Sequence, residues 1–287
     1  MPTRLFGCTP SRLATYAACP RRYRMTYLDR PQPPRGGPWA HSSVGAAVHT
    51  VLKRWWELPL PRRTPFAAVG LLRAGWLRDG FRDEAQAARQ LLLSSDWVRR
   101  YVTGLDPAVP PAGVERTVAT TTRRLAVSGR VDRVDQRGDE LVVVDYKTGR
   151  TAPGPDDAGG SSALALYVLG VRRAYRAACR RVELHHLPTG TVAAFEHTEQ
   201  SLAGHVVRAE DVADAAVAAT TALHAGVDPG TAFPPVLGRH CSWCDLRRHC
   251  PEGRRAAPDR RSWEGLAEVP EHADPGAAYR VQTRRVG

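Results

Sequence analysis

The chain has 287 residues, of which 43% are hydrophobic, so it is long enough for one large domain or two small ones and too apolar to be disordered throughout. Its formal net charge of +12 at pH 7 suits a polyanionic partner, and nucleic acid is the commonest one. A general bias toward arginine is the alternative explanation, because only two of the 41 basic residues are lysines, Lys53 and Lys147.

The N-terminal part of the sequence predicts helices. Ser11 is placed to cap a short helix, and Pro20 fits the first turn of a second one. After a Pro- and Gly-rich loop over 29–43, apolar residues at helical spacing predict a helix over 44–57, and helical pattern continues over 64–101. Most tryptophans of this region are expected in the core, with base stacking as the alternative: Trp55, Trp56, Trp76 and Trp97.

The second half predicts a mixed, partly antiparallel sheet flanked by helices. Alternating segments rich in Val and Thr predict strands over 114–122, 125–135, 140–147, 181–187 and 191–197. Helices are expected over 163–178 and 199–225, with a loop over 151–162. From residue 253 the polar composition predicts a flexible tail, which leaves one domain over 1–252.

Three kinds of segment are not found in the sequence. It has no secretory signal and no GxxxxGK[ST] phosphate loop, and its longest near-apolar run, 163–171, is shorter than the roughly 20 residues that span a bilayer. We therefore expect a soluble, cytoplasmic protein without a membrane partner or an NTP-driven motor of its own. In a reducing cytosol, six cysteines favour metal or thiol chemistry over disulfides.

The two strands around Gly138-Asp139 carry the clearest chemistry. If these residues form a two-residue turn, Asp132 lies opposite Asp145, with Cβ atoms about 4.5–5.5 Å apart, and Lys147 shares their face. Such close carboxylates repel unless a cation joins them, and Mg²⁺ or Mn²⁺ prefers hard oxygen ligands. Lys147 could then assist an attacking water or stabilise a charged transition state. A solvated hairpin with a surface Asp–Lys pair is the alternative.

Four cysteines predict a second metal site: Cys19, Cys241, Cys244 and Cys250. The last three are close in sequence and need a fourth ligand, for which Cys19 is the candidate. Zinc bound by three cysteines with His240 or His249 is one possibility, and four irregularly spaced thiolates also suit a [4Fe–4S] cluster. Either site would join the two ends of the chain in a structural role.

The residues of the carboxylate hairpin resemble the PD-(D/E)XK nuclease superfamily, and specifically its RecB-like branch, in which Gly-x-x-Asp precedes Asp-Tyr-Lys-Thr-Gly. Here the two motifs are 129–132 and 145–149. The segment Ser11-x-Leu13-x2-Tyr16-x2-Cys19-Pro20 is similar to the N-terminal motif of that branch. Gly45-x3-His49-x2-Leu52 is similar to its helical histidine motif. The matches follow the order of the family between residues 9 and 251.

The resemblance implies a restriction-endonuclease-like core and a Mg²⁺- or Mn²⁺-dependent deoxyribonuclease, an exonuclease acting in DNA repair or recombination. It implies that His49, Asp132, Asp145 and the Tyr146 carbonyl bind the metal, and that Lys147 is the catalytic lysine. It also implies a [4Fe–4S] cluster, for which zinc is the alternative, on Cys19, Cys241, Cys244 and Cys250. The implied partner is DNA that is single-stranded or has ends, and the lack of an NTP-binding phosphate loop suggests a helicase in trans.

Further positions bear on these expectations. Tyr167 matches the tyrosine of the family's Gln-x3-Tyr motif, but Ala163 stands at the Gln position. That departure supports the alternative of a catalytically silent nucleic-acid-binding adaptor with an iron–sulfur or zinc site. Glu115, on the strand before the hairpin, is a supporting candidate for the metal site or else a solvated strand-end residue. The run Arg21-Arg22-x-Arg24 is a candidate for phosphate contact.

Overall fold

The computed structural model describes residues 5–266 and 280–285, in which seven strands form one mixed sheet. The strands are β1 (Phe6–Cys8), β2 (Gly113–Thr121), β3 (Leu125–Arg137), β4 (Glu140–Lys147), β5 (Ala178–His186), β6 (Thr191–Glu196) and β7 (Arg280–Arg285). Their order is β1-β3-β4-β5-β6-β7, and β2 pairs with β3. The β1–β3, β4–β5 and β6–β7 pairs are parallel and the others antiparallel. The predicted mixed α/β fold is therefore confirmed.

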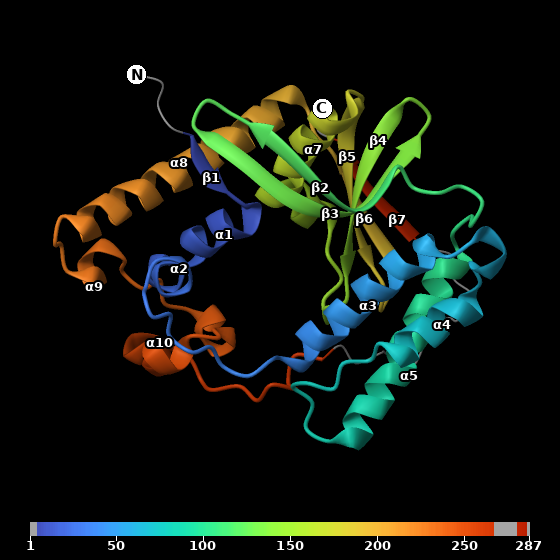
Figure 1. The fold of residues 1–287 in the computed structure, drawn as a ribbon, viewed down its shortest axis with the longest axis horizontal. Coiled ribbons are helices and arrows are strands. Elements are labelled where there is room, and N and C mark those ends of the chain that lie inside the picture. Colours follow the sequence, from blue (N-terminus) through green and yellow to red (C-terminus); the bar gives the residue numbers. More distant parts are fainter. Residues whose placement is uncertain (1–4, 267–279, 286–287) are drawn as a thin grey trace.

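Helices cover both faces of the sheet (Figure 1). They are α1 (Pro10–Ala18), α2 (Pro20–Tyr27), α3 (Ala40–Glu57), α4 (Pro65–Ala74), α5 (Glu84–Thr103), α6 (Pro155–Gly160), α7 (Ser162–Tyr175), α8 (Glu199–His224), α9 (Pro229–Ala232) and α10 (Pro251–Ala256). Short 3-10 turns are η1 (Leu60–Arg62), η2 (Arg239–Trp243) and η3 (Arg247–His249).

Alternation along β4 builds a separate core on each face. Val142, Val144 and Tyr146 pack with α3, α4 and α5 on one face. Leu141 and Val143 pack with α6, α7 and the start of α8 on the other. Because α3 is held against the end of β4 in this way, its polar side chains come close to the β3–β4 hairpin.

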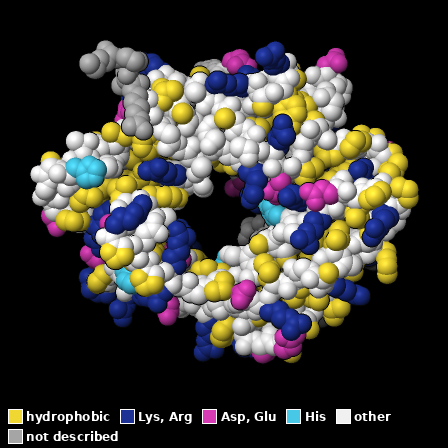
Figure 2. Space-filling model, viewed as in Figure 1, with side chains coloured by type: hydrophobic (Ala, Val, Ile, Leu, Met, Phe, Trp, Pro, Cys, Tyr) yellow, Lys and Arg dark blue, Asp and Glu magenta, His cyan; other side chains and the backbone are white. Residues whose placement is uncertain are grey.

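The elements surround a central opening. The sheet, α1 and α2, the segment from η2 to α10, and α3 to α5 follow one another around it (Figure 1), and Figure 2 shows the same opening between side chains. Contacts between distant segments close the ring. The N–H of Gly36 donates to the Asp245 carbonyl (2.7 Å), and the N–H of Ala40 donates to the Ser262 carbonyl (3.0 Å). The N-terminus of α3 is therefore joined to the C-terminal part of the chain, between η2 and the residues that follow α10.

Some local structure differs from the sequence predictions. The Thr9 side chain, and not that of Ser11, caps α1 by accepting from the Arg12 N–H. The helix predicted to reach residue 178 ends at Tyr175, because Arg176 adopts a left-handed conformation (φ 53°), and β5 starts at once. The segment 151–162, predicted as a loop, contains α6.

The C-terminal region also differs from the prediction of a flexible tail. Residues 253–256 belong to α10, and Leu266 is 8% exposed within the core beside α3. The strand β7 extends the sheet by pairing with β6. The remaining parts of the predicted tail, 267–279 and 286–287, lie outside the described residues. In the part of the chain that the structure describes, every helix is too short or too polar to cross a membrane.

Candidate metal and nuclease site

The β3–β4 hairpin has the register predicted from its turn. Gly138 adopts a left-handed φ of 59°, which a glycine tolerates without strain. The pairs run from Arg137 with Glu140 to Arg133 with Val144. One further step in this register brings Asp132 opposite Asp145. The two aspartates therefore belong to neighbouring strands at one level of the sheet, as the sequence predicted.

A third carboxylate extends this row. In the β2–β3 pair, Val114 lies opposite Arg133 and Arg116 lies opposite Val131, so Glu115 is level with Asp132. Glu115 has a φ of 48°, a left-handed conformation that residues other than glycine rarely adopt. Its side chain is 14% exposed and forms an ion pair with Arg130, with 2.7 Å between Arg130 Nε and Glu115 Oε2. Glu115 is thus not the solvated strand-end residue that was the alternative.

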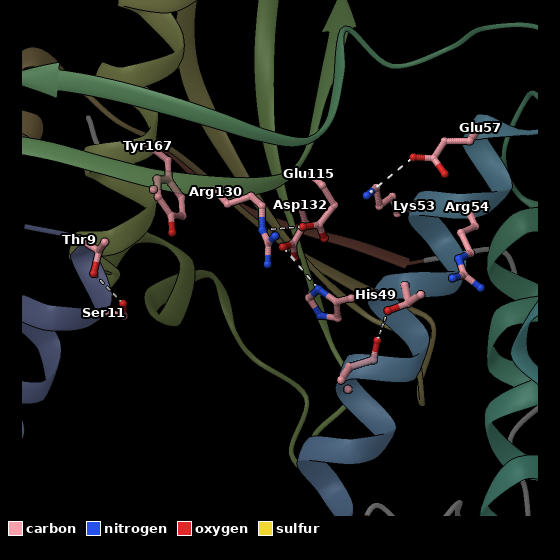
Figure 3. A pocket seen from close by; sticks show the side chains of 14 residues that line it. Thr9, Ser11, His49, Lys53, Arg54, Glu57, Glu115, Arg130, Asp132 and Tyr167 are labelled. Carbon is pink, nitrogen blue, oxygen red and sulfur yellow. Dashed lines mark hydrogen bonds and ion pairs between the residues drawn. The ribbon is translucent and has the colours of Figure 1, made fainter. Parts of the chain in front are cut away.

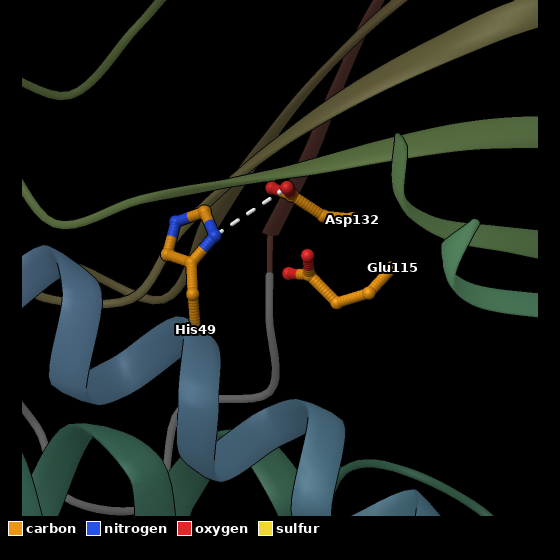
Figure 4. A group of neighbouring side chains, drawn as sticks. All are labelled: His49, Glu115 and Asp132. Atoms are coloured by element: carbon orange, nitrogen blue, oxygen red, sulfur yellow. Dashed lines mark ion pairs between the residues drawn. The ribbon is translucent and has the colours of Figure 1, made fainter. Parts of the chain in front are cut away.

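His49 from α3 joins two of these carboxylates. One ligand atom each from His49, Glu115 and Asp132 lie within 4.8 Å of one another (Figure 4). The His49 Nδ1 is 3.4 Å from Asp132 Oδ1, and its Nε2 is 3.2 Å from the Tyr146 carbonyl oxygen. The structure therefore brings together three of the candidate ligands, His49, Asp132 and the Tyr146 carbonyl, and places the supporting candidate Glu115 beside them.

Asp145 and Lys147 form a close ion pair at the end of β4. Lys147 Nζ is 2.6 Å from Asp145 Oδ2. Burial raises the pKa of Asp145, the ammonium of Lys147 opposes that shift, and the charge of Asp132 adds to it. Asp145 does not belong to the group formed by His49, Glu115 and Asp132. The predicted ligand set is therefore divided in this structure between that group and the Asp145–Lys147 pair.

The acidic surroundings also act on His49 and Tyr167. Burial lowers the pKa of His49, but the hydrogen bond and charge of Asp132, with the charges of Asp145 and Glu115, outweigh it and raise that pKa. The pKa of Tyr167 is raised by burial first, and then by the charges of Asp145 and Asp132. A concentration of negative charge that stabilises a protonated imidazole can equally stabilise a divalent cation.

The side chains of His49, Glu115 and Asp132 line a cavity of about 700 Å³ (Figure 3). Its lining is mostly polar and comes from α1, α3, β2, β3 and α7: Thr9, Ser11, Gly45, Ala46, His49, Thr50, Lys53, Arg54, Glu57, Glu115, Gly129, Arg130, Asp132 and Tyr167. Gly129 allows α7 and α1 to approach the strand closely. A Cβ there would lie 2.5 Å from Tyr167 Cε1 and 3.2 Å from Pro10 Cδ.

Sequence reasoning missed several residues of this cavity. Lys53, Arg54 and Glu57 were not singled out for the site, although Lys53 follows His49 by four residues and so lies on the same side of a helix. The scarcity of lysine was the available signal. The arginines proposed for phosphate contact form ion pairs instead: Arg21 with Glu252, Arg22 with Asp245 and Arg24 with Asp29. Trp55, Trp56 and Trp97 are buried, as predicted.

The four predicted cysteine ligands line one small cavity of about 80 Å³ between α2 and the segment from η2 to α10: Cys19, Cys241, Cys244 and Cys250. A Cβ on Gly253 would lie 3.2 Å from Cys250 Sγ and 3.6 Å from Cys241 Sγ, so this glycine leaves space beside the sulfurs. Among the described residues, no three of these sulfurs lie within 4.8 Å of one another. The rings of His240 and His249 contact backbone carbonyls of Val236 and Pro34.

Comparisons with known proteins agree with this architecture. A crystal structure from Eubacterium rectale, named "Putative exonuclease", is similar in fold with a TM-score of 0.50 and 11% sequence identity, over 84% of this chain and 87% of that one. No curated protein matches the sequence. The sequence profile of the PD-(D/E)XK nuclease superfamily matches residues 8–251, which include the carboxylates, the histidine and the lysine described above. The chain belongs to the PD-(D/E)XK nuclease superfamily.

Proposed function

We propose that this protein is a Mg²⁺- or Mn²⁺-dependent nuclease that hydrolyses DNA phosphodiester bonds. The observation that carries the proposal is the convergence of His49, Glu115 and Asp132 on one point at the wall of a large polar cavity. Their oxygen and imidazole donors fit a hard divalent cation. The Asp145–Lys147 pair at the adjacent strand end supplies the carboxylate and ammonium that the chemistry also needs.

In this proposal His49, Asp132, Asp145 and the Tyr146 carbonyl would hold the cation, with Glu115 in support. The ion, when bound, would polarise the phosphodiester and lower the pKa of a water molecule. The Asp132 carboxylate is kept in orientation by the N–H of Tyr146 (2.9 Å). Lys147 provides a compact ammonium that stabilises negative charge on the phosphate as the bond breaks. Tyr167 forms the facing wall of the cavity.

The central opening supports action on single strands with free ends. The cavity that contains the metal group is lined by α1, α3 and the sheet, which border this opening (Figure 1). The ring around the opening is closed by backbone hydrogen bonds, so a strand end could enter where a closed circle could not. The sequence has no NTP-binding phosphate loop, so we propose that a helicase in trans separates duplex DNA during repair or recombination.

We further propose that the four cysteines bind a [4Fe–4S] cluster. Their side chains line one cavity, and four irregularly spaced thiolates suit such a cluster, with zinc as the alternative. Cys19 lies between α1 and α2, whereas the other three are in the C-terminal segment, so the bound cluster would join these parts and stabilise the fold.

The test compares substrates that differ only in their ends. End-labelled linear single-stranded DNA, the same sequence as a closed circle, duplex DNA and RNA are incubated with increasing Mg²⁺ or Mn²⁺. We expect metal-dependent degradation of the linear single strand and resistance of the circle, and no cleavage by Asp132→Ala. Absence of cleavage at every metal concentration, with binding retained, would instead establish the silent adaptor suggested by Ala163. Cleavage of the circle would overturn the requirement for ends.

A further inference from the structure

We propose that Lys53 binds the phosphate next to the one that is cleaved, and so positions the DNA strand along α3. This inference rests on the proposed nuclease function and assigns to the same cavity a second point of contact with the substrate. It concerns a residue outside the metal-binding and catalytic motifs described above.

The placement of Lys53 on α3 sets its distance from the metal group. Four residues of an α-helix span about 6 Å and return to the same side of the helix, so Lys53 lies one turn beyond His49. Both residues line the cavity. Figure 3 shows Lys53 on the side of α3 that faces Glu115. This separation is comparable with the spacing of adjacent phosphates in an extended strand.

The ammonium of Lys53 is weakly held by the protein. Its contact with Glu57 Oε1 is 3.8 Å long, and the two side chains are 47% and 59% exposed. Exposed pairs of this kind contribute little free energy, so a phosphate can replace Glu57 at small cost. Arg130 in the same cavity is more firmly engaged, because its Nε is 2.7 Å from Glu115. Lys53 is therefore better placed than Arg130 to receive an incoming anion.

The use of lysine at this position is itself informative. Only two of the 41 basic residues are lysines, and while Lys147 pairs with Asp145 in the proposed active site, Lys53 lines the cavity beside it. A lysine ammonium is a compact point charge with freely rotating donors, whereas the planar guanidinium of arginine favours bidentate partners. Contact with a single phosphate beside a metal site favours the compact ammonium.

The first experiment measures binding without cleavage. Fluorescence anisotropy of a linear single-stranded oligonucleotide is recorded in Ca²⁺ at several salt concentrations. We expect Lys53→Gln to weaken binding about 10-fold and to lower the slope of log K against log salt by about 0.7, the contribution of one phosphate contact. Lys53→Arg should keep the slope, and Glu57→Gln should strengthen binding because it removes the competing carboxylate. Arg208→Gln, on α8, removes the same charge elsewhere and should leave the slope unchanged.

The second experiment compares an oligonucleotide with thymidine 5′-(p-nitrophenyl) phosphate, which has no neighbouring phosphate. We expect Lys53→Gln to raise KM for the oligonucleotide about 10-fold, and to change KM for the small diester less than 2-fold. Equal effects on the two substrates, or an unchanged salt slope, would overturn the inference. If the wild-type protein cleaves neither substrate, the proposed nuclease function fails, and the salt slope alone then decides whether Lys53 binds a phosphate.

Discussion

The backbone N–H of Tyr146 donates a hydrogen bond to Asp132 Oδ2 across the β3–β4 pair, over 2.9 Å. The carbonyl of the same residue lies 3.2 Å from His49 Nε2. One peptide segment of β4 is therefore joined to a carboxylate of β3 and to the imidazole of α3. Because the strand register fixes this arrangement, a shift of β4 by one residue against β3 would turn Asp145 to the other face of the sheet, away from Asp132.

Replacing either member of the Asp145–Lys147 pair should abolish cleavage and leave the fold intact. Lys147 is 45% exposed and Asp145 23% exposed, so Lys147→Ala and Asp145→Ala remove little packing. We expect the initial rate on a labelled oligonucleotide to fall by about 10²–10³-fold or more, because a group that stabilises transition-state charge is lost. Circular dichroism and the Tm should remain close to wild type. Full activity in both variants would contradict the assignment.

Protein purified without oxygen should be brown and contain about four iron atoms per chain, with broad absorption at roughly 400 nm. Cys19→Ala should remove the colour and lower the Tm, because the cluster would join α2 to the C-terminal segment. Cys8→Ala is the matched control. Cys8 is 7% exposed and lies outside the cavity formed by the four cysteines, so its replacement should keep the colour. A colourless protein with one zinc ion per chain would exclude the cluster.

The sequence predicts the hairpin well, because a Gly138-Asp139 turn and strand alternation together determine which side chains are opposed. The position of Glu115 was harder to predict, since it depends on an unusual φ and on the pairing of β2 with β3. The closed ring depends on contacts between segments more than 200 residues apart, such as Gly36 with Asp245, which no local pattern encodes. Likewise α6 and β7 arise from tertiary packing against β6.

Gly129→Ala should destabilise the protein and disturb the cavity. The added Cβ would lie 2.5 Å from Tyr167 Cε1, which requires α7 or the strand to shift. Overpacking of this kind costs about 1–3 kcal/mol, which urea unfolding would measure. Adding Tyr167→Leu should restore part of the lost stability, because it removes the ring. Gly7→Ala, on β1, meets nothing within 4 Å and should be nearly neutral, so an equal loss in both glycine variants would refute the packing explanation.

Asp135→Ala should be among the more damaging substitutions. The side chain of Arg133 is 2% exposed. Its guanidinium lies beside the Tyr101 and Tyr146 rings and forms an ion pair with Asp135 at 2.8 Å. Loss of that partner leaves a buried cation uncompensated, for which we expect about 3–5 kcal/mol of destabilisation. Glu84→Ala, which removes an exposed ion pair with Arg78 at the start of α5, should cost less than about 1 kcal/mol in the same urea titration. Similar losses in the two variants would contradict this account of Arg133.

Acidification should destabilise the fold through His197. Its side chain is 2% exposed, its Nδ1 contacts Ser201 Oγ at 3.0 Å, and its Nε2 has no hydrogen-bond partner among the described residues. Burial first, and then the positive charges of His205 and Arg172, lower the pKa of His197 from 6.5 to about 4. Between these values the unfolded chain binds a proton that the folded one does not, so this contribution to stability is complete above pH 6.5 and is lost as the pH falls toward 4.

The measurement compares the free energy of unfolding in urea at pH 7 and pH 5. His197→Gln removes the titrating ring, so we expect it to reduce the loss of stability between these two pH values. His224→Gln replaces an exposed histidine at the end of α8 and should show the same loss as the wild-type protein. If His197→Gln loses as much stability on acidification as wild type, the acid sensitivity arises from other buried groups. Glu183 is then the next to test, because its hydrogen bond with His185 and its ion pair with Arg137 outweigh its burial and lower its pKa.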